Sequence, residues 1–119
     1  MLGIGGGGDV VGALAAAGIA AELGTPASVG GLTWERRPVD PLPGPRLLAE
    51  VTGAEPLHDA AALAGPDAAG PGGFRFAEGR VAELLGEPTV LIDPNPGPAA
   101  IAGGIAAAAE RLGCDLVVL

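Results

Sequence analysis

The chain has 119 residues and a formal net charge of −8, and its six basic residues are all arginine. These few cations cannot neutralise a phosphodiester backbone, so we expect no nucleic-acid partner. The longest uncharged apolar stretches fall short of the roughly 17 residues that a spanning helix needs, so we expect no membrane span either.

A run of glycines near the start precedes the first predicted helix. Gly5, Gly6, Gly7 and Gly8 stand together and are followed directly by Asp9. Consecutive glycines let the backbone approach an anion without interference from Cβ atoms, and the free N–H groups at a helix start can bind that anion. The run therefore predicts a site for a phosphate-sized ligand.

The glycine spacing also fits a dinucleotide-binding turn, although weakly. Gly3, Gly5 and Gly8 satisfy the Gly-x-Gly-x-x-Gly pattern, but adjacent glycines meet many spacings by accident. The acid that binds a ribose hydroxyl should follow by about 20 residues, whereas Glu35 lies 27 residues after Gly8. Rossmann-type NAD binding is therefore not preferred, and the lack of lysine argues against a phosphate-loop NTPase.

Asp9 has two interpretations. Its carboxylate could cap the first helix, which is the common role of an acid at such a position. Alternatively, Asp9 could bind Mg²⁺, which typically uses one or two carboxylates together with phosphate oxygens of a bound nucleotide.

Three helical stretches end in Leu-Gly and are each followed by a short apolar run. Such a glycine caps a helix, and Pro26 and Pro88 prevent continuation. The apolar runs are 27–32, 89–93 and 115–119, and the last two lack polar alternation, as in buried parallel strands. The pattern predicts an α/β fold, a Rossmann-like three-layer sandwich with a mostly parallel sheet.

Two more helices follow from the pattern in the second half. One begins after Phe74 and places Ala77, Val81 and Leu84 on an apolar face, with Glu78 elsewhere on its surface. The other spans 98–112 and consists almost wholly of small apolar residues, so most of its surface should be covered.

Seven prolines interrupt the stretch 38–73. We therefore expect an insertion loop there, either a binding lid or a solvated segment, within a single α/β domain spanning 1–119. Because the chain stops inside the strand-like run 115–119, we also expect an incomplete sheet and favour an amino-terminal fragment of a longer protein.

Four stretches together resemble the amino-terminal part of domain of unknown function family 1152. They are Gly-Ile-Gly-Gly-Gly-Gly-Asp-Val-Val-Gly at 3–12, Thr-Trp-Glu-Arg at 33–36 with 40–46 after it, Gly-Gly-Phe-Arg-Phe at 72–76, and Asp-Pro-Asn at 93–95. The likeness covers essentially the whole chain, and the family continues beyond a segment resembling Leu116–Leu119. The resemblance supports the fold and the glycine loop and implies no particular reaction.

Ligands of open α/β sheets bind at the carboxyl ends of the strands. The residues that follow the predicted strands are Gly5–Asp9, Thr33–Arg36 and Asp93–Asn95. If the strands are neighbours, these groups form one site, although the residues around Asp93 also suit a simple turn. The site would use Asp9, Glu35 or Asp93 for Mg²⁺ or a ribose hydroxyl, Arg36 or Arg37 for a phosphate, and Asn95 for a polar ligand edge.

Two classes of function follow. In the first, the chain binds a nucleotide or other phosphorylated metabolite, with Mg²⁺ as cofactor, as part of an enzyme of unspecified reaction. In the second, it is a non-catalytic structural module whose glycines serve packing and whose open sheet edge pairs with a second copy. The lone Cys114 and the absence of a basic residue before Arg36 predict a cytoplasmic location.

Overall fold

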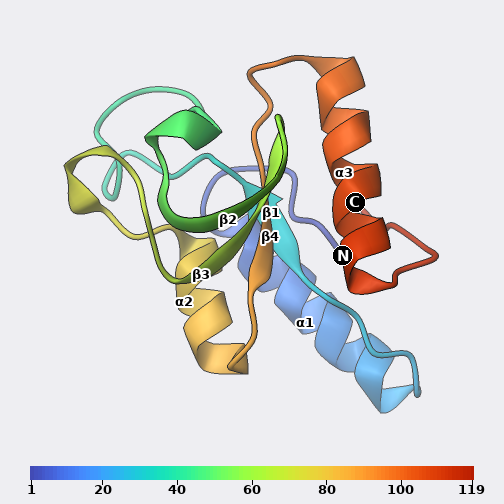
Figure 1. The fold of residues 1–119 in the computed structure, drawn as a ribbon. Helices are drawn as coiled ribbons and strands as arrows, with labels where there is room; N and C mark the ends of the chain where they lie inside the picture. The colour runs from blue at the N-terminus through green and yellow to red at the C-terminus, as the bar shows by residue number, and fades with distance from the viewer.

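A four-stranded sheet lies between two layers of helices in the computed structural model, which describes residues 1–119 (Figure 1). The sheet has the order β1-β4-β3-β2. Its strands are β1 (Gly30–Leu32), β2 (Thr52–His58), β3 (Ala61–Ala69) and β4 (Thr89–Ile92). The helices are α1 (Asp9–Glu22), α2 (Ala77–Leu85) and α3 (Pro98–Leu112), so the α/β class is confirmed.

The helices cover opposite faces of the sheet, because side chains alternate along each strand. Leu63 and Val90 pack in a cluster with Ala108 of α3. Their strand neighbours Ala64 and Leu91 pack instead with Phe76, at the start of α2. The helix α1 lies beside α2 on that second face (Figure 1). No helix combines the length and apolar content needed to cross a membrane.

The expectation of a mostly parallel sheet is wrong. Only β1 and β4 pair in parallel, with Gly30 opposite Val90, whereas β3 runs antiparallel to both β4 and β2. The hairpin of β2 and β3 reverses the chain between these two strands, and β3 pairs with β4 in this reversed direction.

The stretch 38–73 is not a continuous insertion loop, because it supplies the strands β2 and β3. Pro56 is tolerated because β2 is an edge strand, where no hydrogen bond to a further strand is lost. Pro66 lies in an irregularity, since β2 pairs Ala54 with Ala64 but Thr52 with Ala69. The prolines therefore mark an edge and a bulge.

The run 115–119 does not form a strand, contrary to the sequence prediction. A single backbone hydrogen bond of 2.8 Å, from Leu2 N to the Val118 carbonyl, ties it to the sheet edge. Leu2 itself makes only an isolated parallel bridge to Gly30, so it offers no full strand for pairing. Leu116 is consequently 74% exposed and Leu119 67% exposed.

Candidate functional site

The carboxyl edge of the parallel strands brings the glycine loop and the segment after β1 together. Leu2 pairs in parallel with Gly30 of β1, and β1 pairs in parallel with β4. The segments that follow Leu2, β1 and β4 therefore begin at the same edge of the sheet. Gly7 N donates a 2.8 Å hydrogen bond to the Trp34 carbonyl, and Thr33 N donates one of 2.8 Å to the Ile92 carbonyl. The predicted site segments are therefore neighbours.

Two of the loop glycines approach carboxylates so closely that a side chain would not fit. A Cβ on Gly5 would overlap the Asp9 carboxylate, and a Cβ on Gly7 would overlap that of Glu35. Gly7 also has a φ of +46°, which disfavours other residues. Gly6 and Gly8 are more open, since the nearest atoms to an added Cβ lie at 3.5 and 3.9 Å respectively. Glycine is thus required at Gly7 by its backbone conformation and by the buried Glu35, whereas at Gly5 the exposed Asp9 side chain would have to move aside.

Several N–H groups of the loop remain available to a ligand. Gly5, Gly6 and Asp9 donate no hydrogen bond within the chain, while the Gly8 carbonyl accepts the first bonds of α1. Gly5 and Gly6 are half-buried and Asp9 is exposed. Because the first N–H groups of a helix have no partner inside it, this end of α1 retains the capacity to bind an anion.

Asp9 does not cap α1, so this interpretation is wrong. Gly8 is the N-cap residue and Asp9 is the first helical residue, with no side-chain cap bond. Its carboxylate lies against Gly5, where the positive end of the helix favours its charge. No three His, Cys, Asp or Glu side chains gather closely enough to hold a metal ion. Mg²⁺ at Asp9 would therefore need ligand oxygens for most of its coordination.

Glu35 is buried and forms its hydrogen bond within the protein. It is only 4% exposed, and its Oε1 accepts a 2.6 Å hydrogen bond from Ala77 N, the first residue of α2. A carboxylate at this point satisfies one of the free N–H groups of a helix start. The structure thus gives Glu35 a role at the start of α2 and does not present it to a ribose or a metal.

Arg36 and Arg37 are exposed and belong to no ion pair. The Arg36 backbone nitrogen lies 3.9 Å from the position of a Cβ on Gly6, so this arginine follows directly beside the loop. Guanidinium groups bind phosphate through paired hydrogen bonds. Arg36 is therefore a cation without an ion pair whose backbone lies beside the glycines, and Arg37 follows it in the chain.

Asp93 and Asn95 hold a neighbouring loop in place. Asp93 is 2% exposed, and its Oδ1 accepts hydrogen bonds from Asn95 N at 2.8 Å and Asn95 Nδ2 at 2.6 Å. Its Oδ2 accepts a 2.9 Å bond from Leu48 N, and Asn95 Nδ2 also donates to the Arg46 carbonyl at 3.3 Å. The segment Asp93–Asn95 thus forms the turn that its residue types suggest. The predicted role of Asp93 and Asn95 in ligand binding stays a prediction.

Three buried ionisable residues, Asp40, Arg46 and Glu78, were not predicted from the sequence. Arg46 Nε lies 2.9 Å from Asp40 Oδ2, an ion pair that closes the loop between β1 and β2. Glu78 is only 1% exposed, although we placed it away from the apolar face of its helix. The signal was present, because Val81 and Ala82 follow it at the three- and four-residue spacings of one helix face.

A family model described as Protein of unknown function (DUF1152) matches residues 1–119. The chain belongs to this family. No curated protein and no solved structure matches the chain. The family description states no activity, so a function for this DUF1152 protein has to be argued from its geometry.

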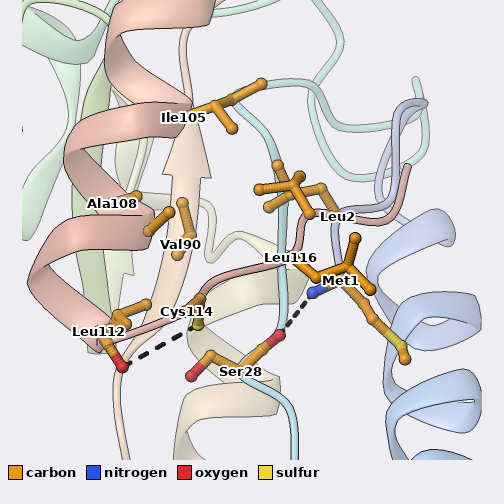
Figure 2. A pocket seen from close by; sticks show the side chains of 11 residues that line it. Met1, Leu2, Ser28, Val90, Ile105, Ala108, Leu112, Cys114 and Leu116 are labelled. Carbon is orange, nitrogen blue, oxygen red and sulfur yellow. Dashed lines mark hydrogen bonds between the residues drawn. The ribbon is translucent and has the colours of Figure 1, made fainter.

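The most apolar pocket of the DUF1152 protein lies away from the glycine loop, between α3, Leu2 and the C-terminal segment (Figure 2). Met1 donates its ammonium proton to the Ser28 carbonyl at 2.7 Å beside this pocket. Its volume of about 30 Å³ holds a water molecule or two. Three other pockets, of about 210 to 380 Å³, are likewise not lined by Gly5–Gly8.

Proposed function

We propose that this DUF1152 protein binds a nucleotide or another phosphorylated metabolite at Gly5–Gly8 and the start of α1. The main support is the set of unbonded N–H groups at Gly5, Gly6 and Asp9, at the positive end of a 14-residue helix. A Cβ on Gly6 or Gly8 would meet its neighbours only at ordinary van der Waals distances, which supports the approach of an oxyanion to this backbone. The proposal concerns binding and assigns no catalytic step.

Charged side chains beside the loop define the ligand further. Arg36 and Arg37 are free to contact phosphate oxygens. Asp9 would repel a phosphate unless a cation bridged the two, so Mg²⁺ accompanies the ligand in this proposal. A net charge of −8 favours such a small, metal-screened ligand over a nucleic acid.

The proposal includes two further expectations, a Rossmann-like mode of binding and a cytoplasmic location. The carboxyl edge shared by β1 and β4 supports a Rossmann-like mode of binding for this part of the sheet. A cytoplasmic location agrees with the single Cys114, which is free.

Thermal unfolding tests the proposal directly. The purified chain is melted with ADP, pyrophosphate, NAD and sugar phosphates, each with and without Mg²⁺. A ligand at 100 times its dissociation constant should add about 2.7 kcal/mol to the free energy of unfolding. The variant Gly6→Val and the double variant Arg36→Ala/Arg37→Ala should lose this gain, whereas Arg80→Ala, an exposed arginine without an ion pair, should keep it. No gain with any probe, or an equal gain in Gly6→Val, would refute phosphate binding.

A separate observation favours a second function, in which the chain is a structural module that associates through its sheet edge. The segment 116–119 is wholly apolar and exposed and lies at the edge beyond Leu2. The opposite edge, β2, carries Glu55, Pro56 and two irregularities, which discourage edge pairing. Packing also accounts for other glycines, because a Cβ on Gly3 or Gly30 would overlap neighbouring backbone.

Light scattering after size-exclusion chromatography separates this second function from the first. Association through the edge predicts a dimer whose population rises with concentration. The double variant Leu116→Glu/Leu119→Glu should then be monomeric, while Leu23→Glu, at the 80% exposed position that follows the C-terminal end of α1, should associate as the parent does. If the parent is monomeric at all concentrations, association through the sheet edge is excluded.

A further inference from the structure

Two buried carboxyl groups lie close together near the start of α2 and take no part in the proposed phosphate site. Glu35 is 4% exposed and Glu78 is 1% exposed. Buried acids are rarely left without an opposite charge, because moving a carboxylate out of water is costly. The surroundings of this pair therefore determine which protonation states the fold can accept.

Glu35 connects two separate parts of the chain. Its Oε1 accepts the 2.6 Å hydrogen bond from Ala77 N at the start of α2. Its Oε2 lies directly against Gly7 in the glycine loop. One ionised side chain thus holds the loop and the helix start in a common position.

Glu78 has no comparable partner. Its Oε1 lies against Gly31 of β1, at a place that only glycine leaves open. Its Oε2 is buried without any hydrogen bond. Thr89 donates to the backbone carbonyl of Glu78 at 3.0 Å and so does not reach the carboxyl group. An unpartnered buried oxygen of this kind is compatible with a protonated acid and costly for a carboxylate.

No cation compensates Glu78 from the elements around it. The strands β1 and β4 contain no charged residue, whereas α1 contributes Asp9 and Glu22 and β3 contributes Asp67, all acidic and exposed. On the α2 side, Arg75 is paired with Glu83 at 2.7 Å, and Arg80 is exposed.

Burial raises the pKa of Glu78 to about 8 against the lowering effect of a hydrogen bond from its own backbone, and the negative charge of Glu35 adds to the rise. Glu78 consequently keeps its proton in most molecules at pH 7 and loses it in mildly alkaline solution.

We propose that Glu35 and Glu78 form a pH-dependent latch, which holds the glycine loop against the start of α2 while Glu78 keeps its proton and opens when the proton is lost to solvent. Loss of the proton places a second negative charge beside Glu35 in a region without a cation. Glu35 follows β1 in a surface loop, so its movement to water relieves the repulsion with the smallest rearrangement. That movement gives up the bond to Ala77 N and the contact with Gly7.

Trp34 reports on this latch. It is the single tryptophan of the chain, it is 42% exposed, and it precedes Glu35 and accepts the Gly7 hydrogen bond. Its fluorescence is recorded from pH 6 to pH 10 without any ligand, so the outcome does not depend on the proposed phosphate binding. We expect an emission change centred near pH 8 in the parent, none in Glu78→Gln, and a parent-like change in the exposed control Glu87→Gln.

Far-UV circular dichroism and hydrogen exchange complete the test. The dichroism should stay constant through the fluorescence transition, because the latch opens without unfolding the helices. If Glu78→Gln does not fold, amide exchange at Gly7 and Ala77 in the parent tests the latch instead. We expect these amides to exchange faster at pH 9 than the intrinsic effect of pH on exchange accounts for. A flat fluorescence profile, a transition that persists in folded Glu78→Gln, simultaneous loss of dichroism, or unchanged corrected exchange would each overturn the latch.

Discussion

The substitution Glu78→Gln should change how the stability of the protein depends on pH. The pKa of Glu78 rises from 4.5 to about 8 on folding, so between these values the folded chain keeps a proton that the unfolded chain has lost. Unfolding in this interval releases the proton. The free energy of unfolding therefore falls by about 1.4 kcal/mol for each unit by which the pH rises. The contribution of Glu78 is fully present below pH 4.5 and lost as the pH rises through about 8.

The total effect is large for a domain of this size. Over the whole interval the loss amounts to roughly 5 kcal/mol, compared with a typical total stability of about 5 to 15 kcal/mol. Glutamine has nearly the same shape as the protonated acid and cannot ionise. The variant should therefore resemble the parent near pH 4.5 and exceed its stability increasingly up to pH 8, above which the difference stays constant.

Urea denaturation followed by Trp34 fluorescence at pH 5, 6, 7, 8 and 9 measures the difference between the two proteins. All other ionisable groups are shared, so their contributions cancel in the difference. Glu87→Gln, at an exposed position directly after α2, serves as the control and should follow the parent at every pH. Equal pH slopes for the parent and Glu78→Gln would show that the buried acid is not neutral in the folded state.

Three further substitutions test the contacts at the carboxyl edge. Gly7→Ala should lower the free energy of unfolding in urea by about 2 to 4 kcal/mol, through its positive φ and the displaced Glu35 carboxylate; an unchanged value would contradict this packing. Arg46→Met should cost about 3 to 5 kcal/mol by leaving Asp40 buried and unpaired, and Asp40→Leu/Arg46→Met should recover most of the loss in the same urea assay. Asp93→Ala should release the loop that Asp93 anchors and expose the Arg46 peptide bond to trypsin, with faster cleavage detected by mass spectrometry; protection equal to the parent would argue against the anchoring role.

Local sequence patterns determined the elements whose cause is local. The glycines at 86 and 113 adopt left-handed conformations at the ends of α2 and α3, as the Leu-Gly pattern predicts. The apolar run before Asp93 forms β4, which is buried throughout. These features depend on backbone geometry and hydrophobicity over a few residues, so they could be predicted from the chain alone.

Tertiary contacts decided the strands β2 and β3. Alanine has little preference for strands, so Ala61–Ala64 gives no local strand signal. These residues become a strand because they pair with β4 on one side and with β2 on the other. The prolines that suggested a loop are acceptable only at the edge and the bulge that this pairing creates.

The roles of the acids were also decided by distant partners. The sequence alone indicated which acids follow the strands, and the parallel pairing of β1 and β4 does place Glu35 and Asp93 at one edge. Their hydrogen-bond partners, Ala77 and Leu48, lie 42 and 45 residues away in the chain. Whether a carboxylate faces a ligand or the protein depends on which N–H group the fold brings to it, and that is a property of the packed structure.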